Sequence, residues 1–237
     1  MNTTKTIKSL GYTFMALVCD NKRPYRFLQL VRSLCFIMVL FFSIFISSAQ
    51  NTLEKQLSAA QIETITINAD QIFNISVSTS KTNQISVISI LDGEYQNDFQ
   101  IVLEEENHTL YLSLEHLSLE EIPDDKRNAH KVIAATLHIK IPEQLILNIS
   151  SDIGSVSLKG DYKALYIELL RGQCDIEGEV EKATVNTLDG NINVVTNSAT
   201  VEANSNHGDI FLDEFSNKNS IWELTSINGD ITVVENK

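Results

Sequence analysis

Residues 188–195 read LDGNINVV, and variants of the same pattern follow as residues 206–213 (NHGDIFLD) and 227–234 (INGDITVV). Each variant is built around a glycine. These glycines follow one another at intervals of 18 residues, with a last interval of 21: Gly154, Gly172, Gly190, Gly208 and Gly229. Similarity at a fixed spacing of this kind is typical of chains that stack similar structural units. We therefore treat residues 146–237 as a repeat region.

Apolar and polar residues alternate on both sides of each glycine, which is the spacing of a strand with one buried face. Two strands and two turns in 18 residues describe one coil of a two-sided β-solenoid, so we expect five coils over residues 146–237. The expected inward positions, two and four residues after each glycine, are Val156/Leu158, Cys174/Ile176, Ile192/Val194, Ile210/Leu212 and Ile231/Val233. The expected inward positions seven, five and three residues before each glycine are Leu147/Ile149/Ser151, Leu165/Ile167/Leu169, Ala183/Val185/Thr187, Val201/Ala203/Ser205 and Trp222/Leu224/Ser226.

The repeat predicts particular contacts if the coils stack in the order of the sequence. Cys174 should be buried beside Val156 and Ile192, and Ile210 should be buried between Ile192 and Ile231. Trp222 should close the end of the stack, where the final coil leaves an open strand edge. The glycines should provide the positive φ that a tight corner favours.

Residues 50–145 lack this period but also alternate, as in Phe73/Ile75/Val77 and Leu137/Ile139/Ile141. Short alternating runs separated by turn-forming clusters predict an antiparallel sheet or sandwich. An acidic loop, Glu115–Arg127, interrupts the series. A short helix is expected only at Leu53–Gln61, outside the leader. The predicted fold class is therefore all-β, with an N-terminal antiparallel region leading into the repeats.

Residues 1–49 have the composition of a secretory signal peptide. A basic stretch that ends at Arg32 precedes the uncharged run 33–46 (SLCFIMVLFFSIFI), and Ser47-Ser48-Ala49 supplies small residues for cleavage. The run is shorter than the roughly 20 apolar residues of a membrane-spanning helix. We expect an exported protein in the periplasm, envelope or extracellular space. An uncleaved signal anchor is the alternative.

The net charge of −13 includes six basic residues and one acidic residue in 1–49, so the remainder carries −18. This charge excludes nucleic acid as a partner, because binding needs basic residues to neutralise phosphates. It also argues against docking on anionic membranes. Cys174 is the single cysteine after residue 49. Residues 50–237 therefore cannot form an internal disulfide or a cysteine metal cluster.

The sequence resembles a known family at two points: ATLHIKIP (135–142) leading into LNISSDIGSVSL (147–158), and the recurring GNINV, GDIFL and GDITV. These residues are similar to the putative adhesin family of bacterial envelope proteins, a domain of unknown function that is built from β-strand repeats and related to autotransporter adhesin heads. The resemblance covers about residues 62–234. It implies an extracytoplasmic interaction module and supplies no catalytic residues.

No residue pattern indicates catalysis. His108, His116, His130, His138 and His207 show no metal-ligand spacing. A calcium-binding nonapeptide roll needs a glycine-rich turn every nine residues, whereas this chain has one glycine per 18, so Asp209 and Asp230 are interpreted as corner residues. Glu202 and Glu223 should be neighbours on an outward face.

Paired carboxylates could serve a polysaccharide-active enzyme, but the rest of that face is a polar, solvated ladder. We therefore expect no catalytic, cofactor-binding or metal-binding residues and no cofactor. The predicted function is a monomeric, non-enzymatic, adhesin-like or envelope-structural protein with a protein or glycan partner. A polysaccharide-active enzyme and a periplasmic component of envelope signalling are the alternatives.

Overall fold

The structure is a computed structural model that describes residues 32, 51–70, 72–92, 99–117 and 134–236. Residues 50–237 form one compact unit. The predicted leader lies outside the described residues except for Arg32, as do most of the acidic loop Glu115–Arg127 and all of His130. The signal peptide therefore stays a prediction.

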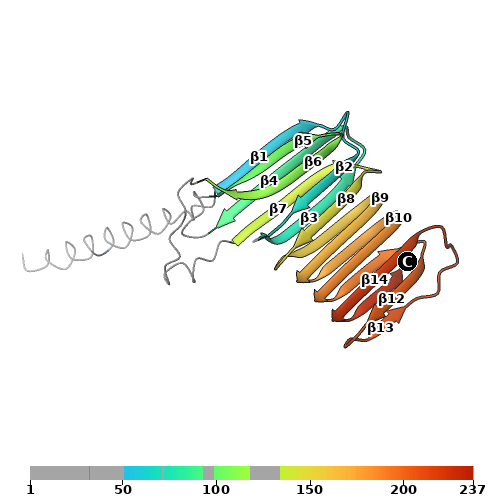
Figure 1. The fold of residues 1–237 in the computed structure, drawn as a ribbon. Coiled ribbons are helices and arrows are strands. Elements are labelled where there is room, and N and C mark those ends of the chain that lie inside the picture. Colours follow the sequence, from blue (N-terminus) through green and yellow to red (C-terminus); the bar gives the residue numbers. More distant parts are fainter. Residues whose placement is uncertain (1–31, 33–50, 71, 93–98, 118–133, 237) are drawn as a thin grey trace, which may run out of the picture. The chain divides into compact units, whose positions relative to one another are not determined.

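Every element described within residues 51–236 is a β-strand, so the all-β prediction is confirmed (Figure 1). The strands are β1 (Asn51–Ser58), β2 (Thr64–Asn68), β3 (Ile72–Ser80), β4 (Gln84–Asp92), β5 (Phe99–Glu106), β6 (Thr109–His116), β7 (Ala134–Pro142), β8 (Ile146–Ser151), β9 (Ser155–Arg171), β10 (Cys174–Asp189), β11 (Ile192–Thr196), β12 (Thr200–Ser205), β13 (Ile210–Leu212), β14 (Ile221–Asn228) and β15 (Ile231–Glu235).

The strands pair in two columns that share β9 and β10. The first column has the order β5–β6–β2–β8–β9–β10–β14–β12, and the second has the order β1–β4–β7–β3–β9–β10–β11–β15–β13. β9 and β10 contribute one half to each column, and each contains a glycine with positive φ between its halves, Gly160 at 117° and Gly178 at 146°. A layer is defined here as one strand of each column joined by a corner.

The central layers pair in parallel with an offset of 18 residues. Cys174 is in register with Val156 on one side and Ile192 on the other, as the repeat predicts. Cys174 is fully buried, and burial together with the charge of Asp175 raises the pKa of its thiol. The inward positions of β8, β9, β10 and β11 form a continuous apolar core, with Thr187 and Ser151 as buried polar members at the corners.

The N-terminal region differs from the expected antiparallel sheet. β1 with β4, β4 with β7, and β5 with β6 are antiparallel. However, β2 pairs in parallel with β6 and β8, and β3 pairs in parallel with β7 and β9. The pairing therefore crosses the boundary expected between residues 145 and 146. Alternation with period two is common to both pairing directions, so it could not distinguish them.

Two smaller expectations for this region are wrong. Residues 51–58 form β1 rather than a helix at Leu53–Gln61, because β1 pairs along its whole length with β4. The alternation also predicts that Phe73 faces inward with Ile75 and Val77, but Phe73 is exposed and Ile72 takes the buried position. The reason is a shift in the register of β3 between Ile72 and Asn74.

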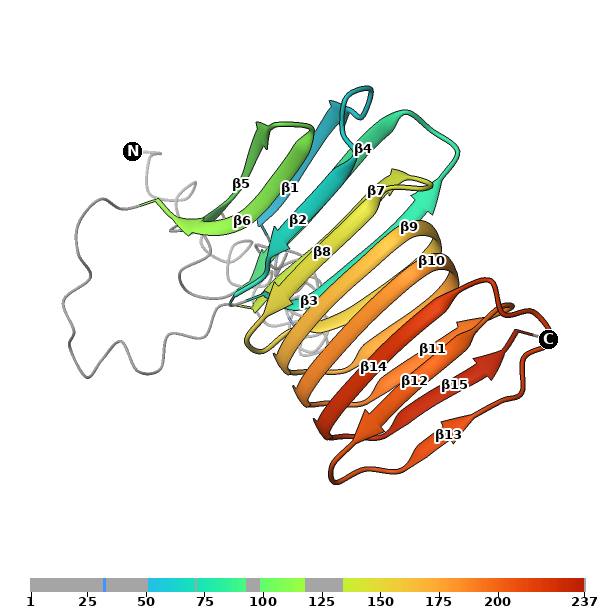
Figure 2. The ribbon, with the colours of Figure 1, turned by 45° about the vertical axis from the view of Figure 1, so that its right-hand side comes forward.

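The last two layers do not stack in sequence order. β14 lies between β10 and β12, and β15 lies between β11 and β13 (Figure 2). Ile231 is therefore the neighbour of Ile192, and Ile210 lies beyond it at the end of the column. Ile210 is 43% exposed, which corrects the prediction of a buried position.

Trp222 is likewise not at the end of the stack. It is fully buried, in register with Ala183 on one side and Val201 on the other. The large indole therefore fills the space between two smaller residues, and its Nε1 is buried with no hydrogen-bond partner among the described residues. The open edges of the stack at this end belong to β12 and β13, and not to the final strands in sequence.

The repeated glycines are explained by close packing more than by backbone conformation. Among the five, Gly172 alone has a positive φ. A Cβ placed on Gly190 would lie 1.9 Å from the carbonyl oxygen of Gly172, and one on Gly229 would lie 2.2 Å from that of Gly190. Gly208 stands in the same relation to Gly229, at 2.1 Å. The glycine ladder, Gly154–Gly172–Gly190–Gly229–Gly208, thus follows the spatial order of the layers.

A hydroxyl three residues before the glycine holds most of these corners. Ser151 Oγ accepts a hydrogen bond from the Gly154 N–H at 2.9 Å, and Ser205 Oγ accepts one from the Gly208 N–H at 2.9 Å. Ser226 Oγ donates to the Gly190 carbonyl at 3.2 Å. These side chains satisfy buried backbone groups where the strand ladder is interrupted.

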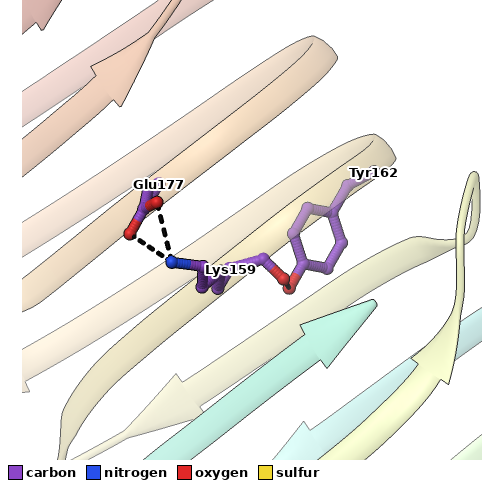
Figure 3. Close-up of polar contacts among 3 residues, drawn as sticks. All are labelled: Lys159, Tyr162 and Glu177. Atoms are coloured by element: carbon purple, nitrogen blue, oxygen red, sulfur yellow. Dashed lines mark hydrogen bonds and ion pairs between the residues drawn. The ribbon is translucent and has the colours of Figure 1, made fainter. Parts of the chain in front are cut away.

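The opposite corner is fixed by Tyr162, which is buried and donates its phenolic O–H to the Val77 carbonyl at 3.1 Å. Burial is the main cause that raises the pKa of Tyr162. Nearby, Lys159 Nζ bridges to Glu177 in the next layer at 2.8 Å, with both side chains largely exposed (Figure 3). An exposed pair of this kind contributes at most about 1 kcal/mol, so the tyrosine matters more for this corner.

Candidate functional site

The outward face of the first column carries a row of exposed apolar side chains two residues before the glycine corner. Leu170, Leu188 and Ile227 are 51%, 43% and 38% exposed. The residues on either side of them are in register across β9, β10 and β14, so the three lie on adjacent strands. Adjacent strands are about 4.8 Å apart. The row therefore forms a continuous apolar ridge across three layers.

An open groove of about 560 Å³ runs beside this ridge. Apolar side chains line one part of it, and acidic side chains from β9 and from the turns after β2 and β8 line the other. The principal lining residues are Leu170, Leu188, Ile227, Glu168, Asp152 and Asp70. The combination gives an apolar surface with negative charge at one end, which suits a ligand with apolar and cationic parts.

The sequence predicted a polar, solvated ladder on this face, and that prediction holds only for some rows. Tyr166 is 44% exposed, and Glu168, Asn186 and Thr225 point toward the groove. The apolar ridge was missed. Its signal was present, because Leu170, Leu188 and Ile227 occupy outward positions of the alternation, immediately after an inward residue. When the same outward position is apolar in three repeats, the three side chains are expected to form an exposed row.

Glu202 and Glu223 are direct neighbours on β12 and β14, as predicted. Glu223 is engaged in an ion pair with Lys182 at 3.0 Å and accepts a hydrogen bond from Thr184 at 3.1 Å. These two hydrogen bonds and the charge of Lys182 lower the pKa of Glu223. A glycosidase needs one carboxyl with a raised pKa to donate a proton. Lys182 and Thr184 instead lower the pKa of Glu223, which makes this carboxyl a weaker proton donor.

The histidine side chains that the structure describes, those of His108, His138 and His207, are dispersed rather than assembled. His138 is exposed, as its phase in β7 predicts, and His207 is exposed at a corner. His108 lies in the turn between β5 and β6, with its Nδ1 2.8 Å from the Gln61 carbonyl oxygen. Within the described residues, no three histidine, cysteine, aspartate or glutamate side chains group as metal ligands do.

Asp209 and Asp230 hold the corners, in agreement with their interpretation from sequence. Asp230 Oδ1 accepts from the Asp209 N–H at 2.8 Å, and Asn191 Oδ1 accepts from the Asp230 N–H at 2.9 Å.

In the part of the chain that the structure describes, no helix is long and apolar enough to cross a membrane.

No sequence family and no curated protein matches the chain. Solved structures do match. One is described as a "putative cell adhesion protein" from Clostridium sporogenes, with 14% identity, a TM-score of 0.57, and coverage of 79% of this chain and all of that one. Another is a "putative adhesin" from Bacteroides fragilis, with 12% identity and a TM-score of 0.34, covering 78% of this chain and 97% of that one. The first of these structures confirms the predicted resemblance at the level of the fold.

Proposed function

We propose that this protein is a non-enzymatic, extracytoplasmic, adhesin-like interaction module whose repeat region is a β-solenoid with an 18-residue period. The observation that carries the proposal is the apolar ridge Leu170–Leu188–Ile227 beside an open groove. A contiguous exposed apolar patch on a monomer commonly marks an interaction site. The adhesin-like fold neighbour from C. sporogenes supports the same role.

The regular spacing of side chains along the stack favours binding over catalysis. A rigid repeat presents side chains at fixed spacing over a long face, which is how solenoid proteins bind extended partners. Polar groups that could orient a ligand, such as Asn186 and Thr225, lie next to the apolar ridge. We infer that a protein or glycan in the cell envelope, or on another cell, lies along this face.

The test compares two matched substitutions on opposite columns. Leu188→Gln removes an apolar side chain from the ridge without changing charge, and Phe73→Gln removes one of similar exposure, 42% against 43%, from the second column. Fluorescently labelled protein is titrated onto intact bacterial cells and onto animal cells, and bound protein is measured by flow cytometry. Saturable binding that falls about tenfold in Leu188→Gln, and is unchanged in Phe73→Gln, is the expected result.

Two outcomes would contradict the proposal. One is saturable binding that both variants retain in full, which would place the contact elsewhere. The other is the release of new reducing ends when the protein is incubated with envelope polysaccharides. That release would favour the enzymatic alternative and would direct attention to Glu202.

A further inference from the structure

The β12–β13 layer leaves the core of the stack uncovered at one end. Ile210 and Leu212 are in register with Ile231 and Val233, which are fully buried, yet they are 43% and 41% exposed. In the first column, Val201 and Ala203 lie half-buried over Trp222 and Leu224. These residues have the inward phase of core positions but are covered on one side only.

Only some of the backbone N–H and C=O groups of β13 are directed toward a neighbouring strand. The Ile231 N–H donates to the Asp209 carbonyl at 2.9 Å, and the Asp213 N–H donates to the Val233 carbonyl at 2.9 Å. In a parallel pair, alternate residues direct both backbone groups to the same neighbour. Ile210 and Leu212 therefore direct their N–H and C=O groups away from β15. Among the described strands, β13 pairs with β15 alone.

The charges around β13 identify what can pair with this edge. Asp209 precedes the strand, Asp213 and Glu214 follow it, and Phe211 between them is 58% exposed. Residues 209, 211 and 213 share one face because side chains alternate along a strand. The edge thus presents an acidic–aromatic–acidic series on one face and the apolar pair Ile210 and Leu212 on the other.

A second copy of this chain is a poor occupant. The antiparallel register that pairs residues 210–212 of two copies is centred on Phe211. It places Asp209 of each copy opposite Asp213 of the other. Like charges that face each other across a strand pair are destabilising. The net charge of −13 adds to this repulsion at longer range.

We propose that the free edge of β13 takes up an extended segment of another protein as an added strand. That segment carries apolar residues at alternating positions and a lysine or arginine at each end. Its apolar side chains cover Ile210 and Leu212, and its basic side chains pair with Asp209 and Glu214. Asp213 is held within the fold, because its Oδ2 accepts a hydrogen bond from the Glu235 N–H at 3.1 Å. Main-chain hydrogen bonds to residues 210 and 212 supply affinity, as in other cases of β-strand addition. This site is separate from the groove, and neither proposal depends on the other.

The test uses two synthetic peptides, SKITVKS and its acidic counterpart SEITVES, added to ¹⁵N-labelled protein. We expect the basic peptide to shift the amide signals of Ile210 and Leu212 in ¹⁵N–¹H correlation spectra, because new hydrogen bonds form there. The signals of Leu170 and Leu188, at the groove, should not shift. The acidic peptide should bind at least about tenfold more weakly, and added salt should weaken the binding of the basic one.

Two variants separate strand addition from general charge attraction. Leu212→Pro removes an N–H that the fold does not use, so the protein should stay folded while peptide affinity falls about tenfold. Asp209→Asn combined with Glu214→Gln keeps every backbone donor and lowers affinity through charge alone. The groove variant Leu188→Gln should bind the peptide normally.

The proposal is overturned if the basic peptide shifts neither amide, if both peptides bind equally, or if a folded Leu212→Pro variant binds as tightly as the parent. Light scattering provides the remaining check. A dimer of the parent protein that Leu212→Pro abolishes would make a second copy the occupant, and would also overturn the proposal.

Discussion

Replacing one isoleucine at a time in the second column tests the order in which the layers stack. Ile192, Ile231 and Ile210 occupy equivalent inward positions on β11, β15 and β13. The first two are fully buried, whereas Ile210 is 43% exposed. Because the three residues have the same side chain and the same place in the repeat, differences among their alanine variants report their neighbours rather than their chemistry.

The expected costs follow from burial. Truncation of a fully buried isoleucine to alanine lowers the free energy of unfolding by about 2–5 kcal/mol, because it removes apolar contacts and leaves a cavity. At Ile210, part of the side chain is in water and the end of the stack is open, so about 1–2 kcal/mol is expected. In a chain of this size, each kcal/mol lowers the melting temperature by about 2–4 °C.

Urea titration measured by circular dichroism gives these free energies, and the fluorescence of Trp222, the single tryptophan, reports on the same end of the stack. Ile192→Ala and Ile231→Ala should be similar, and Ile210→Ala should be clearly milder. If Ile210→Ala costs as much as Ile231→Ala, the β12–β13 layer is internal and the stacking order described above is wrong.

Three further predictions concern single sites. Gly190→Ala should destabilise the protein by about 1–3 kcal/mol in thermal melts, because its Cβ would lie 1.9 Å from a backbone oxygen, and an increase in stability would contradict the ladder. A thiol reagent should label Cys174 slowly in the native protein and fully in denaturant, since burial encloses the thiol and raises its pKa; rapid native labelling would place it at the surface. The lowered pKa of Glu223 means that its pairing with Lys182 stabilises the fold above the pKa of the unfolded carboxyl, and that this contribution is lost as pH falls through the folded pKa. In Lys182→Met, a carboxyl NMR titration should show the Glu223 pKa rising toward the ordinary value of about 4.3, and an unchanged pKa would refute the ion pair.

Much of the fold could be predicted because each layer carries its own pattern. Alternation predicted most of the inward positions, as at Cys174 though not at Phe73, and the glycine spacing predicted the corners. The order of the layers could not be predicted in this way. All layers share one pattern, so any layer can satisfy the alternation of any other, and the repeat does not specify which one is its neighbour.

Side-chain volume is a better guide to the order in which the layers stack. Trp222 fits between Ala183 and Val201, but at the end of the stack its indole would be exposed. The loop between β13 and β14 is another such signal. It contains the buried Phe215, and its Asn217 carbonyl accepts a hydrogen bond from the Ala199 N–H at 3.1 Å. Residues 213–220 are therefore a connection between layers that Phe215 and this hydrogen bond anchor to the stack.

The candidate site was harder to predict for a related reason. A rule that assigns outward positions to solvent treats an exposed leucine as incidental, so Leu170 and Leu188 were not recognised as a row. The row becomes visible only when neighbouring strands are placed side by side in register. Glu202 and Glu223 were correctly paired because both lie at the same repeat position.

The position of β14 and β15 has a consequence for how the protein is made. During synthesis, β12 and β13 emerge while β10 and β11 still present an open edge, because residues 221–235 have not yet been added. An 18-residue offset, the one that β10 and β11 themselves use, would let β12 and β13 pair there with the same alternation. We therefore expect β12 and β13 to pair with β10 and β11 in the growing chain until β14 and β15 displace them. A chain stopped at residue 220 should pair β13 with β11, which places Ile210 beside Ile192 at the end of a shorter stack.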